Sequence, residues 1–285
     1  MQPFASHPAL APDAAIDLQL HTTASDGTWT PQSLVDYLVR EEFALAAVTD
    51  HHRMDTVTEI QRRATERQLA VLAGVEMSTT WRDNAVDVLC YGFPAGHNDL
   101  FELAAAVAGR HLENAQTVSI QLQWQGYRFP RQQEVLREMG GEPRHANDLA
   151  LLLQAHGYGP ASAVWPTLHE AGARWSSTDL ATVVAAAHRS GAICVIAHPG
   201  RGGEDHHGFA EPLLEELCQQ VPIDGLEVYY PRHTPQQTAM YLAYAHRRGL
   251  LVSAGSDSHG PHRPPVRYRA EVCCALLERI GIKVR

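Results

Sequence analysis

Five short segments of the chain contain residue types that bind metal ions, and each lies in or beside an apolar run. They are DLQLHTTASDG (17–27), AVTDHH (47–52), AGVEMS (73–78), VIAHPGR (195–201) and GSDSHG (255–260). Histidine, aspartate and glutamate hold the divalent cations that activate water for hydrolysis. Parallel strands of an α/β barrel present their carboxyl ends at one face, so ligands placed there on several strands can meet in one site. The five segments together predict a multinuclear metallohydrolase.

Spacing within the segments indicates which side chains share a face. Gln19 and His21 lie two apart on a predicted strand, and Asp257 and His259 are also two apart. Residues two apart on a strand point to the same side. We expect Glu76 to end an apolar strand, where an unpaired carboxylate is costly to bury, and its two oxygens allow it to bridge two cations. A single histidine can equally be a hydrogen-bonded core or surface residue, so the prediction depends on the five segments together.

Two further histidine pairs are less decisive. In AVTDHH, His51 is the better ligand candidate, while Asp50 is a candidate for fixing an imidazole and His52 is a ligand or a solvated loop residue. His206 and His207 lie in the glycine-rich stretch GRGGEDHHG, where solvated loop residues are the first interpretation.

Composition limits the protein class. A chain of 285 residues, 45% of them hydrophobic, can form one barrel-sized domain with a small insertion. The formal charge of −9 argues against a broad basic surface, so we expect no long nucleic-acid binding surface. The five cysteines form no CxxC pair. The start MQPFASHPALAP lacks signal-peptide features and no apolar run reaches membrane-spanning length, so we expect a cytoplasmic protein without a membrane partner. The oligomeric state is left open.

The elements that must position the ligands follow a strand–helix rhythm at both ends of the chain. The expected strands cover residues 15–20, 43–48, 69–75, 86–91, 192–197, 225–229 and 250–254. The expected helices of this part cover residues 30–41, 55–67, 177–188, 212–219, 235–248 and 268–280. Between them lie four helical patterns, at 103–123, 132–139, 145–156 and 162–171. We predict a barrel from 1–97 and 176–285, and a helical insertion at 98–175 that covers the substrate at the barrel mouth.

On these motifs the chain resembles the PHP family, named for polymerase and histidinol phosphatase domains. The resemblance runs from about residue 15 to 262 and includes GLEVYY (225–230) and the PRH element (143–145). Within the family it is most similar to stand-alone phosphoesterases that act on nucleoside 3′,5′-bisphosphates and on the 5′ ends of short RNA. The resemblance implies a distorted (β/α)7, TIM-like barrel with two to three divalent metal ions, manganese first and iron or zinc as alternatives.

The resemblance also implies three ligand sets, carried over position by position. The first set is Gln19, His21, Glu76 and Asp257, the second Glu76, Asp87 and His198, and the third Asp26, His51 and His259. Gln19 stands where the family usually has the first histidine of an HxH pair, and Asp87 in VDVLCYG (86–92) also replaces a histidine. Aspartate is a good ligand for hard cations, whereas a neutral amide oxygen is a weaker donor than imidazole for borderline cations.

The expected reaction is hydrolysis of a phosphate ester of a small nucleotide-like substrate by metal-bound hydroxide. Arg201 follows His198-Pro199-Gly200 and can bind phosphate bidentately, and His233 can protonate the leaving alkoxide. Arg144 and His145 resemble the family's substrate-contacting element, with pairing on a helix surface as the alternative.

Three other functions are compatible with parts of this pattern. Histidinol-phosphate phosphatase, or hydrolysis of another small phosphomonoester or phosphodiester, requires the same fold and metals. An amidohydrolase-type deaminase or peptidase also uses an HxH pair on the first strand of a barrel, but Gln19 breaks that pair. The replacements at positions 19 and 87 also allow a degenerate, non-catalytic metal-binding or nucleotide-binding protein.

Overall fold

The computed structural model describes residues 9–202 and 208–285, and the predicted loop histidines His206 and His207 lie outside them. By its internal contacts the chain divides into two compact units. One unit comprises Met1–Ala104 and Ser177–Arg285, and the other comprises Ala105–Ser176. The first contains the strands and all five ligand segments, whereas the second consists of helices.

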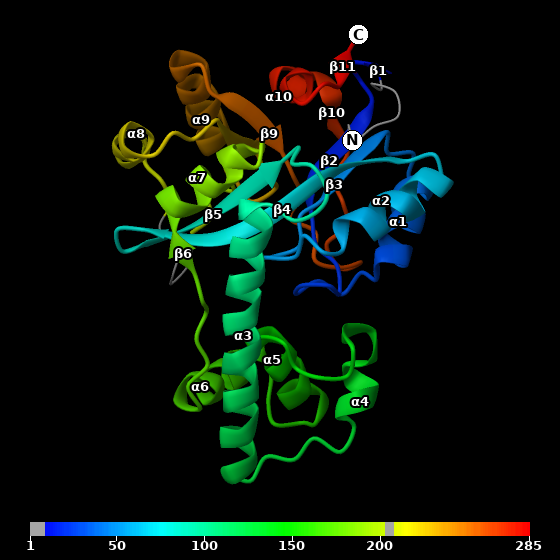
Figure 1. Ribbon diagram of the computed structural model, residues 1–285, viewed down its shortest axis with the longest axis vertical. Coiled ribbons are helices and arrows are strands. Elements are labelled where there is room, and N and C mark those ends of the chain that lie inside the picture. The colour runs from blue at the N-terminus through cyan, green and yellow to red at the C-terminus, as the bar shows by residue number, and fades with distance from the viewer. Residues whose placement is uncertain (1–8, 203–207) are drawn as a thin grey trace. The chain divides into compact units, whose positions relative to one another are not determined.

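The larger unit is built on one nine-stranded sheet (Figure 1). The strands in spatial order are β10 (Tyr268–Arg269), β2 (Ala15–Leu20), β3 (Leu45–Val48), β4 (Ala70–Trp81), β5 (Asn84–Tyr91), β7 (Ile193–Ile196), β8 (Gly225–Tyr229) and β9 (Leu251–Ala254). The short strand β6 (Thr178–Asp179) pairs with β4 outside this order. Near the chain ends, β1 (Ala9–Leu10) pairs in parallel with β11 (Lys283–Val284).

The sheet is mostly parallel and curls into a barrel. Strands β2, β3 and β4 are mutually parallel, as are β7, β8 and β9, while β5 runs antiparallel to both β4 and β7. The segment after β9 then meets β2, because Asp257 donates its backbone N–H to Gln19 O at 3.0 Å and His21 donates to Ser258 O at 3.0 Å. The expected fold class, a distorted TIM-like barrel, is confirmed.

Helices flank the strands of this unit. They are α1 (Pro31–Arg40), α2 (Val57–Glu66), α7 (Leu180–Arg189), α8 (Glu211–Gln220), α9 (Pro235–Arg248) and α10 (Cys274–Arg279). Their starts follow ordinary capping rules: the Thr30 side chain accepts the Ser33 N–H at the start of α1, and Thr234 and Gln237 form a capping box on α9. Leu34 of α1 belongs to the apolar cluster that covers the outer face of β3.

A second apolar cluster lies on the face of the sheet that carries the site. Leu72 of β4, Leu89 of β5 and Val195 of β7 belong to it. Because side chains on a strand alternate, Glu76 shares a face with Leu72, and Asp87 shares a face with Leu89. The two carboxylates therefore lie on the same face of the sheet as the apolar cluster, farther along β4 and β5.

The helical unit has its own core. Its elements are the part of α3 (Asp99–Trp124) from residue 105 onward, α4 (Gln132–Val135), a 3₁₀ turn (Arg137–Met139), α5 (Ala146–Ala155) and α6 (Ala161–Glu170). Val118, Leu122, Leu149 and Leu168 are fully buried together in this unit. Across the described residues of the chain, we find no helix that is both long and apolar enough to cross a membrane.

Two elements differ from the sequence-based expectation. Glu76 does not end a strand, because β4 continues to Trp81 and pairs from Gly74 onward with β5 in an antiparallel hairpin. The partner strand satisfies the backbone of residues 78–80, which lie beyond the strand expected at 69–75. The tail 268–280 is not one helix: it begins with β10, which pairs with β2, and continues as a 3₁₀ turn (Ala270–Cys273) before α10.

Gly255 supplies a stability prediction, because a Cβ atom there would lie 2.3 Å from Glu227 Oε1 and 2.5 Å from Gln19 Cβ. We expect Gly255→Ala to lower the free energy of unfolding by about 1–3 kcal/mol through overpacking. Urea unfolding measures this change. The control is Gly109→Ala in α3, where nothing lies within 4 Å and alanine is the better helix former. Equal stabilities of Gly255→Ala and wild type would contradict the close packing.

Candidate metal centre

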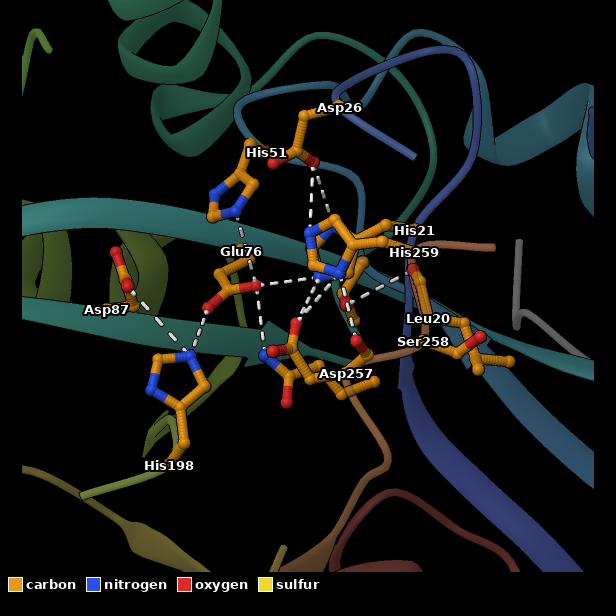
Figure 2. Close-up of polar contacts among 12 residues, drawn as sticks. Leu20, His21, Asp26, His51, Glu76, Asp87, His198, Asp257, Ser258 and His259 are labelled. Atoms are coloured by element: carbon orange, nitrogen blue, oxygen red, sulfur yellow. Dashed lines mark hydrogen bonds and ion pairs between the residues drawn. The ribbon is translucent and has the colours of Figure 1, made fainter. Parts of the chain in front are cut away.

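The five ligand segments meet around the carboxylate of Glu76 (Figure 2). Glu76 Oε2 lies 3.0 Å from His21 Nε2, and Glu76 Oε1 lies 3.1 Å from His198 Nε2. The Gln19 side-chain amide donates to Glu76 Oε2 at 3.0 Å. His51 Nε2 is 3.8 Å from the same oxygen. One buried carboxylate thus contacts side chains that follow or belong to β2, β3 and β7.

Four more contacts extend the group on the side of His21. Asp257 Oδ1 lies 3.3 Å from His21 Nε2 and 3.4 Å from His259 Nδ1. The other ring nitrogen of His259, Nε2, is 3.3 Å from Asp26 Oδ1. The rings of His21 and His259 stack with their centroids 4.1 Å apart. The segment after β9 and the loop after β2 therefore share one cluster of imidazoles and carboxylates.

Asp87 lies on the other side of Glu76. Its Oδ2 atom is 3.9 Å from His198 Nε2, and its side chain is buried. The strand alternation that puts Asp87 on the face of Leu89 explains this direction. Both of these carboxylates come from the β4–β5 hairpin, in which Ser78 pairs with Asp87 and Glu76 pairs with Leu89.

Three sets of donor atoms in this cluster are close enough to share an ion. Within each set the donor atoms lie within 4.8 Å of one another. The first set is His21, Asp26, His51 and His259. The second is His21, Glu76 and Asp257, and the third is His51, Glu76 and Asp87. They overlap the three ligand sets implied by the sequence, with His21 added to the third set and His51 beside Glu76 and Asp87. His198 Nε2 also lies beside these two carboxylates, at 3.1 Å from Glu76 Oε1 and 3.9 Å from Asp87 Oδ2.

Burial and neighbouring charges set the ionisation of the cluster. Burial alone would raise the pKa of Glu76, but His51, His198 and His21 outweigh it and hold that pKa well below its usual value. Burial likewise opposes protonation of His21, yet contacts with Asp257 and Glu76 raise its pKa well above the ordinary value. The carboxylates are therefore ionised and require positive charge beside them, from imidazolium groups or from cations.

The donor set fits divalent cations. Carboxylate oxygens and imidazole nitrogens are ligands for manganese, iron and zinc. Gln19 adds a specific observation: its amide nitrogen is used by Glu76, while its Oε1 atom is buried without a hydrogen-bond partner among the described residues. A buried carbonyl oxygen without a partner is uncommon and costly. A cation beside Glu76 would satisfy it.

Two ligand-bearing residues have strained backbones. The φ angle is +28° at His198 and +55° at Asp257, a region that non-glycine residues seldom occupy. Buried carboxyl groups hold the neighbouring backbone: Glu227 Oε2 accepts the His198 N–H at 2.9 Å, and Asp17 accepts the Ser256 N–H at 2.9 Å. Such strain persists only where the surroundings fix it, and it concentrates at functional sites.

Asp17 and Glu227 are residues that the sequence analysis missed as parts of the site. Burial raises the pKa of Asp17 to about 7 and that of Glu227 well above its usual value. Their signal was present, since each is an acidic residue inside an apolar strand, in DLQLH and GLEVYY. We infer that they position the ligand-bearing loops.

Asp50 has a different partner from the one expected. Its carboxylate accepts the Thr22 N–H and Thr22 hydroxyl, both at 2.7 Å, and the Ser25 hydroxyl at 2.6 Å. It therefore fixes the loop between His21 and Asp26. His52 is buried, with φ at +56°.

Arg201 lies beside the cluster. A cleft is lined by Asp87, His198, Pro199, Arg201 and Phe209, among others. Burial alone would lower the pKa of Arg201, but the negative charges of Asp257, Asp87 and Glu76 raise it. A partly buried guanidinium facing this cleft is suited to binding an anion.

The structure does not support His233 as a general acid. Its Nε2 atom accepts the Gly200 N–H at 3.0 Å, so Nδ1 carries the proton and donates to Val228 O at 3.0 Å. Burial also lowers the pKa of His233. A ring nitrogen that accepts from the backbone has no proton to give, so His233 holds the loop at Gly200 instead.

Two side chains orient Asp257 and were not expected from the sequence. Arg263 Nη2 lies 3.0 Å from Asp257 Oδ2, and the Tyr230 hydroxyl donates to the same oxygen at 3.3 Å. These contacts leave Oδ1 facing His21. Tyr230 ends GLEVYY, a segment already singled out, whereas Arg263 lies three residues beyond the GSDSHG motif (255–260) and had no such signal.

Arg144 and His145 belong to the helical unit. Arg144 Nε lies 3.2 Å from Asp148 Oδ2, and His145 Nε2 is 3.6 Å from Asp148 Oδ1. Both side chains thus pair with Asp148, which is itself buried. Contact of either residue with substrate stays a prediction.

Comparison with known proteins identifies the family of this chain. The model of the PHP domain matches residues 17–259, so the chain belongs to the PHP family, as its motifs predicted. It is 27% identical over 261 residues to the 5′-3′ exoribonuclease Rnm of Escherichia coli (strain K12), covering 86% of this chain and 85% of that protein. It is also 27% identical over 269 residues to the 3′,5′-nucleoside bisphosphate phosphatase of Chromobacterium violaceum, covering 87% and 88%.

A solved structure supports the fold independently. A chain from Bifidobacterium adolescentis, described as a metal-dependent phosphoesterase, aligns with a TM-score of 0.79 at 24% identity. The alignment covers 94% of this chain and 97% of that one. The two chains therefore have the same fold along nearly their full lengths.

Gln19 generates a prediction about metal affinity. Gln19→His should tighten Mn²⁺ binding by about tenfold, or about 1.4 kcal/mol. The reason is that an imidazole nitrogen is a stronger donor than a neutral amide oxygen, whereas the oxygen donors that manganese prefers here are charged carboxylates. Isothermal titration calorimetry measures the affinity, and exposed Gln219→His on α8 is the control. Unchanged Mn²⁺ affinity and unchanged kcat/KM in Gln19→His would show that Gln19 is only structural.

Proposed function

We propose that this protein is a metal-dependent phosphoesterase that hydrolyses a phosphate ester of a small nucleotide-like substrate. Nucleoside 3′,5′-bisphosphates and the 5′ ends of short oligonucleotides are the substrates that we expect. The observation that carries the proposal is the group of imidazoles and carboxylates around Glu76, with the Arg201 side chain beside it. The matched relatives, a bisphosphate phosphatase and an exoribonuclease, both act on phosphate esters of nucleotides.

Two to three divalent cations are expected in the centre, manganese first and iron or zinc as alternatives. The proposed ligands are the nine residues Gln19, His21, Asp26, His51, Glu76, Asp87, His198, Asp257 and His259. When bound, such cations lower the pKa of a water molecule and withdraw charge from the phosphoryl oxygens. Glu76 is the proposed bridging ligand, since each of its oxygens faces a different histidine.

The chain's own residues bind and orient the substrate phosphate. Arg201 offers a planar pair of N–H donors to two phosphoryl oxygens, and its charge is retained at any physiological pH. His233 and Gln237 hold the loop that carries it, because both contact the backbone of Gly200. The phosphate would lie between this guanidinium and the Asp87–His198 side of the ligand cluster.

The overall charge is consistent with a small substrate. At −9 the protein has no excess of positive charge with which to bind a long polyanion, so specificity for phosphate has to come from the site itself. Location in the cytoplasm, where nucleotides are available, is part of the proposal.

A substrate screen tests this function. We expect Mn²⁺-dependent phosphate release from adenosine 3′,5′-bisphosphate or from the 5′ end of a short RNA, abolished by EDTA and restored by Mn²⁺. Asp87→Asn should lower kcat/KM by at least about tenfold, since removing even a supporting group of a metal site costs that much. The control is Asp83→Asn, at an exposed position on the turn of the same hairpin.

The screen also separates the alternatives. Release from histidinol phosphate, with no turnover of either nucleotide substrate, would identify the other phosphatase specificity. Bound Mn²⁺ without turnover of any phosphoester would indicate a non-catalytic binder and would overturn the proposal.

Arg201 generates a second kinetic prediction. Arg201→Ala should raise KM by about 10–100-fold, because hydrogen bonds to charged groups contribute about 1.5–3 kcal/mol. Arg201→Lys should recover only part of that loss, since an ammonium cannot bind two oxygens in the same geometry. Steady-state kinetics with the best substrate of the screen measure KM, with exposed Arg40→Ala on α1 as the control. An unaltered KM in Arg201→Ala would remove Arg201 from the site.

A further inference from the structure

A second group of metal-ligand side chains lies outside the proposed phosphoesterase centre. It consists of His188 at the end of α7, Cys194 in β7 and Asp224 directly before β8, which we call the outer cluster. His188 Nε2 lies 2.7 Å from Asp224 Oδ2, and the three ligand atoms are all within 4.8 Å of one another. Three separate elements thus bring a nitrogen, a sulfur and an oxygen donor to one place.

The outer cluster is separated from the catalytic centre by the geometry of β7. Val195 belongs to the apolar cluster on the site face of the sheet. Alternation turns the neighbouring Cys194 to the opposite face, toward α7. His198 follows the carboxyl end of β7, whereas Asp224 precedes the amino end of the parallel strand β8, so the two sites lie toward opposite ends of these strands.

A second cysteine stands opposite Cys194. Cys90 of β5 pairs with Cys194 in the antiparallel register. The backbone groups of Cys194 are both directed to the other neighbour, because its N–H donates to Asp224 Oδ2 at 2.8 Å and its carbonyl accepts the Asp224 N–H at 2.9 Å. Cys90 and Cys194 therefore form a non-hydrogen-bonded pair, the type in which cross-strand side chains lie closest.

These observations point to a ligand set for a borderline cation. A surface ion pair would explain the contact of His188 with Asp224 but contributes little by itself. It does not explain why the thiol of buried Cys194 also lies within 4.8 Å of both groups, or why a second cysteine, Cys90, pairs with Cys194 across the strands. Cysteine, histidine and aspartate together are typical zinc ligands, whereas manganese and magnesium prefer oxygen donors.

We propose that the outer cluster binds one zinc-type divalent cation through His188, Cys194 and Asp224, with solvent completing its coordination. The side chains of His188 and Asp224 are 35% and 29% exposed, which gives the cation an entry path from solvent. Cys194 is buried beneath them. The cation would take the place of the proton between His188 Nε2 and Asp224 Oδ2. It would join α7 to the starts of β7 and β8, which is a structural role.

Cobalt is the probe that separates the two sites. Only the outer cluster contains sulfur, because none of the nine proposed ligands of the catalytic centre is a cysteine. A thiolate-to-cobalt charge-transfer absorption therefore reports on the outer cluster alone. We expect the reduced wild-type protein to show this absorption on titration with Co²⁺, with a final amplitude that corresponds to one thiolate-bound cobalt per chain.

Variants complete the test. Cys194→Ala should abolish the absorption, and His188→Ala should weaken Co²⁺ binding at this site by more than about tenfold, the loss seen even for residues that only support a ligand. Cys274→Ala, in α10, is the control and should retain the wild-type absorption. His188 is at the surface, so its substitution tests the site even if the buried Cys194→Ala variant fails to fold. All three variants should keep Mn²⁺-dependent phosphoesterase activity.

Several outcomes would overturn the proposal. Absence of the absorption in reduced wild-type protein would do so, as would an unchanged spectrum in both His188→Ala and Cys194→Ala. A Cys90–Cys194 disulfide, detected by mass spectrometry, in protein that binds no cobalt after reduction would identify the pair as a redox cross-link instead. None of these results depends on phosphatase turnover, so failure here is distinguishable from failure of the proposed function.

Discussion

The site depends on the burial of several carboxylates within a few ångströms of one another. Two like charges 4 Å apart repel by about 4 kcal/mol at the effective dielectric constant of a protein. Glu76 and Asp257 are almost fully buried, and both contact His21. Such a group is stable only with positive charge among the carboxylates. The fold therefore requires imidazolium groups or metal cations beside them. The donors come from strands separated in sequence, whose ends meet at one face of the barrel.

The β4–β5 hairpin is the element that adapts an ordinary parallel barrel to this demand. Extending β4 beyond the neighbouring β3 carries Glu76 past the ends of the other strands, where it forms an isolated bridge with His51. The reversed strand β5 then returns along it and brings Asp87 to the same face. Because the two strands pair directly, the spacing between these carboxylates is set by backbone hydrogen bonds rather than by a loop. This rigidity favours the bridging role proposed for Glu76, because the position of its carboxylate relative to Asp87 is fixed.

Local sequence patterns predicted the strands, their order of appearance and the convergence of His21, Glu76 and His198, because apolar runs followed by polar donors are local signals. The length of β4 and the reversed direction of β5 could not be predicted, since each depends on which distant segment completes the backbone pairing. The position of the His233 proton was unpredictable for a related reason: its tautomer is set by the Gly200 N–H and the Val228 carbonyl. Residue type indicated a possible proton donor, whereas the contacts determine where its proton lies.

Alternation along β7 explains how one barrel can keep two kinds of donor apart. Val195 faces the apolar cluster continuous with the catalytic centre, and Cys194 faces the helix α7. A thiol among the oxygen and nitrogen donors of the centre would favour zinc over manganese and would expose sulfur to oxidation there. Placing the cysteines on the opposite face avoids both effects. In the proposed centre, a Gln19 oxygen in place of an imidazole would favour hard over borderline cations. It would act on metal preference in the same direction as the exclusion of the cysteines.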